Sequence, residues 1–225
     1  MESVWIPLTY ICNQIKENVK SQEVKALQEL LGKSKDASLL RHTVKLALTS
    51  NPITNVFTTE VSIYNRVRAY KIWYDKVARD KDWDHKNKIK TQYGGEWTLD
   101  AEREYKFRYD IWSNVHYGFI GLCAGFTKFE LSNGAGVAQL MDNIKSSSEW
   151  GQQYLKNRLV DIGDADILGA FDDAEDAQAV KVGYSLYEKY GHVPQTLKPR
   201  DILHELYIFL QNHKPLAIEK CKIRR

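Results

Sequence analysis

Three aspartates within one helical turn form the densest group of reactive side chains in the sequence: Asp172, Asp173 and Asp176. Carboxylates this close together can share a proton, bind a divalent ion through oxygen or supply half of an acid/base pair. Acidic residues at the start of a helix also satisfy free N–H groups and interact favourably with the helix dipole, without any catalytic role. Catalysis and helix capping are therefore equal alternatives for these residues.

A second group of polar residues lies in the aromatic-rich segment YDIWSNVHYGF, which contains Asp110, Asn114, His116 and Tyr117. Burial among aromatic rings raises the pKa of a carboxyl group and lowers that of an imidazole, and such shifts suit acid/base catalysis. A single histidine beside a tyrosine is more often a hydrogen-bonded structural residue. We treat Asp110 and His116 as candidate catalytic residues, and Asn114 and Tyr117 as candidate substrate contacts.

The polar stretch DKDWDHKNKIKTQYGGEWTLD contains three further candidates, Trp83, Asp84 and Lys86. The lysine could hold an anionic substrate, the aspartate could orient it or act as a base, and the tryptophan could stack on sugar rings or nucleobases. A solvent-exposed turn, with the tryptophan packed inside, is the structural alternative. Gln139 and Gln178 could position a substrate through amide hydrogen bonds.

Helices are the main elements expected to position these residues. Apolar residues recur every three or four positions in several stretches: residues 10–31, 38–48 and 62–80, a helix capped by Asp172 or Asp173, and a helix opened by Pro199. A glycine pair in the polar stretch leaves room for one short hairpin near residues 90–100. The sequence therefore predicts a mainly α fold, a compact helical domain with at most one small hairpin.

A break in the helical pattern indicates the domain organisation. Residues 49–59 contain Asn51, Pro52 and several threonines, a composition typical of a linker. We place the boundary near residue 62. The prediction is a short helical N-terminal region, residues 1–61, followed by a main domain, residues 62–225.

Composition narrows the possible functions. The chain has 225 residues, of which 43% are hydrophobic and 27% charged, so it can bury a compact core. A net charge of +3 is small for a nucleic-acid-binding domain. The sequence has no zinc-type spacing of Cys and His, no G-x-S-x-G motif and no phosphate-binding glycine loop. We expect no cofactor or metal, with a divalent cation at clustered carboxylates as the alternative.

Four sequence elements, in order, resemble the polymorphic toxin type 44 family. Along the chain they are residues 83–86 (WDHK), 109–121 (YDIWSNVHYGFIG), 134–139 (GAGVAQ) and 171–178 (FDDAEDAQ). Ala174 stands where the family commonly has proline, and the first 60 residues lie outside the resemblance. Family members also carry asparagine at the position of His116, so we rank Asp110 above His116.

The resemblance implies an antibacterial effector domain. Such domains are often the tail of a secretion-system carrier, such as a type VI VgrG spike protein or an Rhs protein, and the producing cell then needs a cognate immunity protein. The N-terminus does not read as a signal peptide, and no apolar run approaches transmembrane length. We therefore expect synthesis in the cytoplasm and delivery into target bacteria.

Two enzymatic functions and one non-enzymatic function remain open. The first is a glycosidase-type peptidoglycan hydrolase in the target periplasm, in which two aspartates act as acid and base or nucleophile; the carboxylates and the 12% aromatic content favour it. The second is a ribonuclease in the target cytosol, favoured by the nine Lys/Arg against four Asp between Arg66 and Tyr93. The third is an adaptor or immunity partner. We favour the first.

Overall fold

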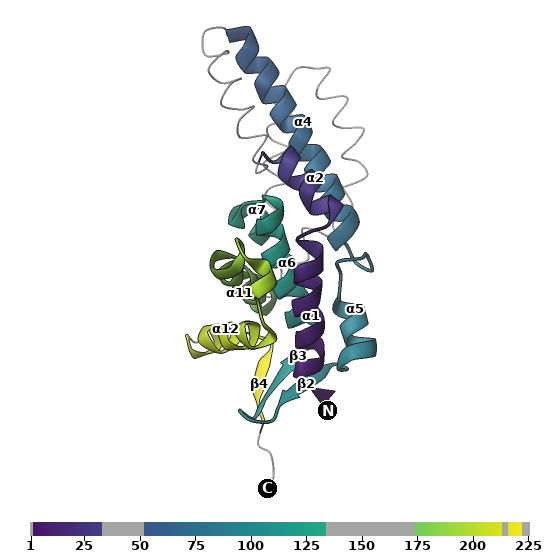
Figure 1. Cartoon of the computed structure of the whole chain (residues 1–225), viewed down its shortest axis with the longest axis vertical. Coiled ribbons are helices and arrows are strands. Elements are labelled where there is room, and N and C mark those ends of the chain that lie inside the picture. The colour runs from purple at the N-terminus through teal and green to yellow at the C-terminus, as the bar shows by residue number, and fades with distance from the viewer. Residues whose placement is uncertain (1, 33–51, 134–173, 213–215, 222–225) are drawn as a thin grey trace.

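The computed structural model describes residues 2–32, 52–133, 174–212 and 216–221, and helices dominate this part of the chain (Figure 1). The mainly α prediction is therefore confirmed. The helices are α1 (Trp5–Asn18), α2 (Gln22–Leu30), α4 (Pro52–Val77), α5 (Lys86–Lys88), the π-helical turn η1 (Ile89–Tyr93), α6 (Asp110–Ala124), α7 (Lys128–Asn133), α11 (Ala174–Tyr190), the 3-10 turn η2 (Pro194–Thr196) and α12 (Pro199–Gln211).

A four-stranded sheet at one end of the molecule corrects the expectation of at most one small hairpin (Figure 1). Its strands, in spatial order, are β1 (Glu2–Ser3), β2 (Trp97–Asp100), β3 (Tyr105–Arg108) and β4 (Ile218–Lys220). β2 and β3 form the hairpin, β1 pairs parallel to β2, and β4 pairs antiparallel to β3. The expectation was wrong because the outer strands are too short to show an alternating pattern, and long-range pairing alone makes them strands.

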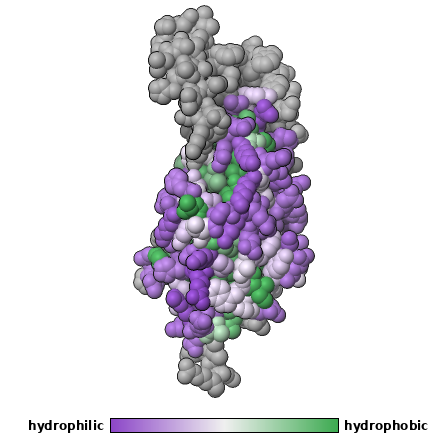
Figure 2. Space-filling model, viewed as in Figure 1, coloured by the Kyte–Doolittle hydropathy of each residue, from purple (hydrophilic) through white to green (hydrophobic). Residues whose placement is uncertain are grey.

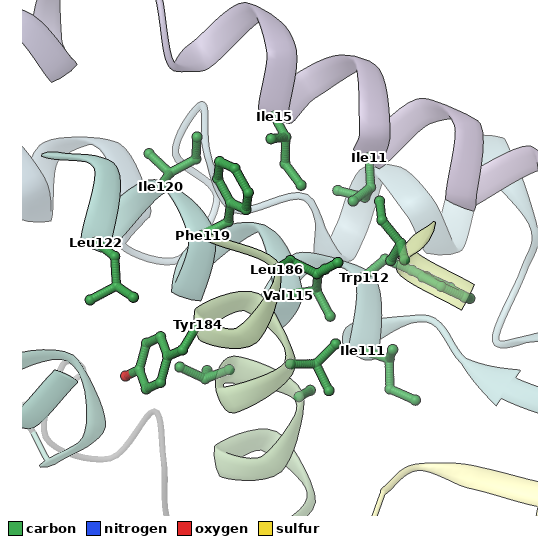
Figure 3. Packing of buried hydrophobic residues seen from close by; sticks show 14 of the residues in the cluster. Ile11, Ile15, Ile111, Trp112, Val115, Phe119, Ile120, Leu122, Tyr184 and Leu186 are labelled. Atoms are coloured by element: carbon green, nitrogen blue, oxygen red, sulfur yellow. The ribbon is translucent and has the colours of Figure 1, made fainter. Parts of the chain in front are cut away.

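Helix α6 lies at the centre of the fold, and every one of its residues except Tyr117 is buried. Figure 3 shows Ile11 and Ile15 of α1 on one side of α6, and Tyr184 and Leu186 of α11 on another. Each large apolar side chain that is fully buried in this way stabilises the fold by roughly 1.5–3 kcal/mol. Residues at the first turn of α6 are therefore held by a rigid support.

Two glycines allow α6 and α11 to cross in backbone contact. A Cβ atom on Gly118 would lie 2.2 Å from the carbonyl oxygen of Val180, and one on Gly183 would lie 2.3 Å from the carbonyl oxygen of Val115. Real Cβ atoms do not approach backbone so closely, so only glycine fits at both positions. The crossing fixes the first turn of α11 relative to the first turn of α6.

The N-terminal helix packs into the same core as α6. Leu8, Ile11 and Ile15 of α1 are fully buried, and the N–H of Val4 donates a hydrogen bond to the carbonyl oxygen of Leu99 in β2 (2.9 Å). The predicted boundary near residue 62 falls inside the continuous helix α4. The division into residues 1–61 and 62–225 nevertheless stays a prediction.

Part of the predicted linker is helical. Residues 52–59 form the first turns of α4, so this part of the segment is helical, and its role as a linker stays a prediction. Proline suits the first turn of a helix, where its missing N–H costs nothing, and Pro52 occupies the first position of α4. The helical run predicted at residues 38–48 lies outside the described residues.

The surface drawn in Figure 2 is mostly hydrophilic, with small and separate hydrophobic spots. Ile6, Phe129 and Val193 are the large hydrophobic side chains exposed to solvent within the described residues. In the same part of the chain, no helix combines the length and the apolar character needed to cross a membrane.

Candidate active site

Arg108, the last residue of β3, gathers carboxylates from two helices. Its Nε atom donates to both carboxylate oxygens of Asp110, at 2.8 and 2.7 Å, and its Nη2 atom lies 2.7 Å from Oδ2 of the same residue. Its Nη1 atom donates to Glu175 (3.1 Å), and Nη2 lies 3.7 Å from Oδ1 of Asp176. One guanidinium therefore contacts three carboxylates.

Lys86 adds a second cation to this group. Its Nζ atom lies 3.3 Å from Oδ2 of Asp176, 90 positions away in the sequence. We call Lys86, Arg108, Asp110, Glu175 and Asp176 the ionic cluster. The structure thus brings together three residues that the sequence singled out: Lys86, Asp110 and Asp176.

The ionic cluster forms where two helices begin. Asp110 is the first residue of α6, and Glu175 and Asp176 lie in the first turn of α11. The partial positive charge of a helix N-terminus favours negative side chains there. The hydrogen bonds to Asp110, and then the charges of Asp110, Glu175 and Asp176, raise the pKa of Arg108 above its usual value. Both effects hold the charged groups in place.

The ionic cluster combines buried and accessible groups. The side chains of Asp110 and Asp176 are 10% and 13% exposed, whereas those of Lys86 and Glu175 are both 34% exposed. Its five described residues carry three negative and two positive charges. A substrate that approaches the accessible side would therefore meet a site with a small negative excess.

His116 lies elsewhere, in a buried pair with His85. Both residues are 1% exposed, and their ring centroids are 4.4 Å apart with the planes almost perpendicular. Nδ1 of His85 is 2.9 Å from the hydroxyl of Tyr10, and Nε2 of His116 is 2.9 Å from Nδ2 of Asn18. Burial lowers the pKa of His85 to about 4 and lowers the pKa of His116 well below its usual value. This neutral pair fits a structural role for His116.

Trp83 and Tyr117 pack in the core. Trp83 is 5% exposed, and its ring contacts that of Trp73 at 5.8 Å between centroids. The ring of Tyr117 lies 5.1 Å from that of Trp73, and burial raises the pKa of its hydroxyl. In this structure, neither ring is available as an open platform for a substrate.

Asp84 closes a turn. Its carboxylate accepts hydrogen bonds from the backbone N–H groups of Asp80 (3.0 Å) and Lys86 (3.2 Å). Asp80 has a φ of +62°, a left-handed conformation that a side-chain hydrogen bond to the backbone helps to hold. These contacts give Asp84 a local structural task next to Lys86.

Of the remaining candidate residues, some have buried amide groups and the others lie outside the residues that the structure describes. Nδ2 of Asn114 and Oε1 of Gln178 are buried and have no hydrogen-bond partner within the described residues. Asp172, Asp173 and Gln139 lie outside those residues. In the described ranges, no group of three or more His, Cys, Asp or Glu side chains is arranged so that it could hold a metal ion.

Sequence reasoning missed Arg108 and Glu175. Both lay beside segments that attracted attention, since Arg108 immediately precedes YDIW and Glu175 stands within DDAEDAQ. The usable signal was its spacing, because Arg108 stands two positions before Asp110, although the strand and the helix that bring the two together were not predicted. A cation there is well placed to meet the carboxylate at the start of the helix.

Comparison with known proteins identifies the family. The model of the family described as Bacterial toxin 44 matches residues 72–189, slightly more than half of the chain. No curated protein and no solved structure matches the chain significantly. The matched segment contains all five residues of the ionic cluster and both glycines of the helix crossing. The chain belongs to the bacterial toxin 44 family.

Proposed function

We propose that this toxin is a hydrolase that cleaves the glycan strands of bacterial peptidoglycan at the ionic cluster. The observation that carries the proposal is the convergence of Asp110, Glu175 and Asp176 on the guanidinium of Arg108. Glycosidases use two carboxyl groups about 5–9.5 Å apart on either side of the scissile bond. Asp110 and Glu175 contact different nitrogens of the Arg108 guanidinium and would form such a pair.

The contacts suggest a division of roles. Asp110, held at both oxygens by Arg108, would act as the nucleophile or as the carboxylate that stabilises the positively charged transition state. Glu175, the most exposed carboxylate of the cluster, would enter the reaction protonated, give its proton to the leaving oxygen and then take a proton from the attacking water. Asp176 contacts both Lys86 and Arg108 and would position the two cations.

The charge balance favours a sugar over a phosphate. An oxocarbenium-like transition state carries positive charge, which the carboxylate of Asp110, and that of Glu175 as it loses its proton, would stabilise. A phosphodiester would bring another negative charge into the same site. Electrostatics therefore supports glycan cleavage in preference to RNA cleavage.

Ribonuclease activity is the second candidate, because lysines and aromatic rings alternate in segments around the cluster. Lys88 lies over the ring of Tyr10 (5.0 Å), Lys90 over that of Tyr109 (5.0 Å) and Lys106 over that of Trp97 (4.5 Å). Rings and cations together bind single-stranded nucleic acids. Two of these lysines also face acids, since Lys90 lies 4.0 Å from Glu96 and Lys106 lies 2.6 Å from Glu219. These acids weaken the attraction for phosphate.

The biological setting follows from the family. A toxin of this kind would reach target bacteria on a secretion-system carrier such as a VgrG or Rhs protein, and an immunity protein would protect the producing cell. Glycan cleavage would require delivery to the periplasm. Expression with and without an export signal tests this point, because killing only after export supports a cell-wall target and killing only in the cytosol opposes it.

Purified protein decides between the two substrates. Incubation with peptidoglycan sacculi should release muropeptides, and incubation with total RNA should leave the RNA intact. Asp75→Asn is a matched control, because Asp75 is an exposed aspartate of α4 outside the cluster, and it should retain full activity. Degraded RNA with intact sacculi would instead establish the ribonuclease candidate, and inertness toward both would favour a non-catalytic adaptor.

A further inference from the structure

A cavity of about 320 Å³ is lined by residues of the β2–β3 turn, by the first residue of α1 and by one face of α12. Trp5, Leu203 and Tyr207 supply its apolar and aromatic surface, and Glu102, Arg103 and Arg200 supply exposed charged groups. The volume is within the range of small-ligand sites. None of the lining residues belongs to the ionic cluster, so the cavity is a second, separate site.

The turn that carries Arg103 is held in place from three sides. The hydroxyl of Tyr207 donates to Oδ2 of Asp100 (2.7 Å), and the backbone N–H of Glu102 donates to Oδ1 of the same carboxylate (3.1 Å). The N–H of Cys221 donates to the carbonyl oxygen of Glu104 (2.7 Å). The cavity is therefore largely preformed, which reduces the entropy lost when a ligand binds.

The two arginines at this cavity form no ion pair with any described residue. The guanidinium of Arg103 lies 4.2 Å from the ring centroid of Tyr207, and that of Arg200 lies 6.0 Å from the ring centroid of Trp5. A guanidinium beside a ring keeps its N–H groups available for a planar carboxylate. Glu102 adds an exposed negative charge that could accept an amine.

We propose that this cavity binds a short peptide with free carboxylates and a free amine, as found in the peptide stems of peptidoglycan. This rests on the proposed function and makes the cavity a subsite for the same substrate. Asp100 pairs with Tyr105 and Trp97 pairs with Arg108, so the length of β3, about 10 Å, separates the cavity from the ionic cluster. A glycan strand at the cluster could therefore place a peptide stem in the cavity.

The mixed charge of the lining favours a peptide over a nucleotide. Asp100 and Glu102 both contribute carboxylates, which oppose a phosphate but suit a ligand that carries an amine beside its carboxylates. Trp5, Arg200, Leu203 and Tyr207 also lie outside the segment that matches the family. Two helices outside the matched segment, α1 and α12, therefore supply part of the cavity lining.

Direct titration with the N-acetylated stem tetrapeptide, acetyl-L-alanyl-γ-D-glutamyl-diaminopimelyl-D-alanine, whose one free amine is that of diaminopimelate, tests the cavity by isothermal calorimetry on the full chain. Saturable binding is expected. Arg103→Gln and Arg200→Gln should each weaken it roughly tenfold, because each removes a charge-assisted hydrogen bond. Arg79→Gln is the matched control, an exposed arginine away from the cavity, and should leave binding unchanged. No saturable binding, or equal weakening by all three changes, would overturn the proposal.

A change at Glu102 keeps the proposal testable if the arginine variants fail to fold. Glu102→Gln should weaken binding of the tetrapeptide but not of a tetrapeptide whose diaminopimelyl amine is acetylated. Equal affinity of Glu102→Gln and the unaltered chain for the free-amine peptide would contradict the assigned role of Glu102 and the peptide class with it.

Cleavage assays separate this proposal from the proposed function. The chain should cleave intact sacculi faster than glycan strands from which an amidase has removed the peptides, and Arg103→Gln should abolish that preference. Cleavage of sacculi without tetrapeptide binding would overturn the cavity proposal and leave the proposed function standing. Tetrapeptide binding without cleavage would do the reverse.

Discussion

The ionic cluster and the His85–His116 pair use the same helix in opposite ways. Asp110 begins α6 and meets charged partners, whereas His116, further along α6, meets the neutral side chains of Asn18 and His85. Both residues belong to one aromatic-rich segment, and their types alone make both candidates for acid/base catalysis. The difference shows that position along a buried helix, at its end or in its interior, separates a candidate reactive group from a structural one.

The largest effect should come from removing the carboxylate at the end of α6. Asp110→Asn should lower the rate of muropeptide release by about 10²- to 10⁴-fold, because the amide can neither attack nor stabilise positive charge well. The thermal midpoint should fall by only a few degrees, because Arg108 keeps Glu175 and Asp176 as partners. Activity close to that of Asp75→Asn, or complete unfolding, would remove Asp110 from the proposed chemistry.

The second-largest effect, on stability, should come from the backbone contact between α6 and α11. Gly118→Ala should destabilise the fold by about 3 kcal/mol, because its Cβ meets the backbone of Val180 and the helices must move apart. Gly121→Ala is the control on the same helix, since the atoms nearest to its Cβ belong to the side chain of Leu131 and not to backbone. Denaturant unfolding compares them, and an equal loss in both variants would refute the backbone-contact explanation.

Acid should weaken the buried pair of His85 and His116. Folding lowers the pKa of His85 from 6.5 to about 4, so the folded state resists protonation and the unfolded state accepts it. Stability is therefore fully present above about pH 6.5 and declines as the pH falls toward 4, by about 3 kcal/mol for His85 alone.

Two histidine variants, one at a buried and one at an exposed position, sharpen this pH test. His116→Asn should retain activity and show a shallower loss of stability between pH 6.5 and 5, because one buried imidazole no longer resists protonation. His192→Asn, at an exposed histidine, should keep the slope of the unaltered protein. A slope that is unchanged in His116→Asn would show that other groups cause the acid sensitivity.

The sequence was sufficient for several of the helices, though not for the central helix α6, and for part of the site. Apolar spacing predicted the helices that became α11 and α12, because each buries one continuous face. Strands β1 and β4 could not be predicted in this way. They have two and three residues, and they owe their conformation to partners far away in the sequence.

The same distinction explains the candidate site. Lys86, Asp110 and Asp176 were found as reactive residue types within recognisable motifs, whereas Arg108 was missed because its importance comes from three-dimensional contacts. Trp83 and His116 carry suitable chemistry but are buried, and local sequence does not reveal which face of an aromatic-rich segment turns inward. Contacts with residues far away in the sequence decide whether a side chain joins the ionic cluster or is buried in the core.

The smallest effect should come from Asp84, whose chemistry resembles that of Asp110 but whose contacts do not. Asp84→Asn should change muropeptide release less than about threefold and cost roughly 0.5–1 kcal/mol of stability, because one amide oxygen can still accept a backbone hydrogen bond. Asp82→Asn, at a neighbouring exposed aspartate, controls for loss of negative charge in this segment. Because Asp84 also bonds the backbone N–H of Lys86, a selective rise in KM would mean that the turn positions this lysine for substrate. A loss of kcat as large as that of Asp110→Asn, in a folded protein, would instead place Asp84 among the reacting groups and extend the site beyond the ionic cluster.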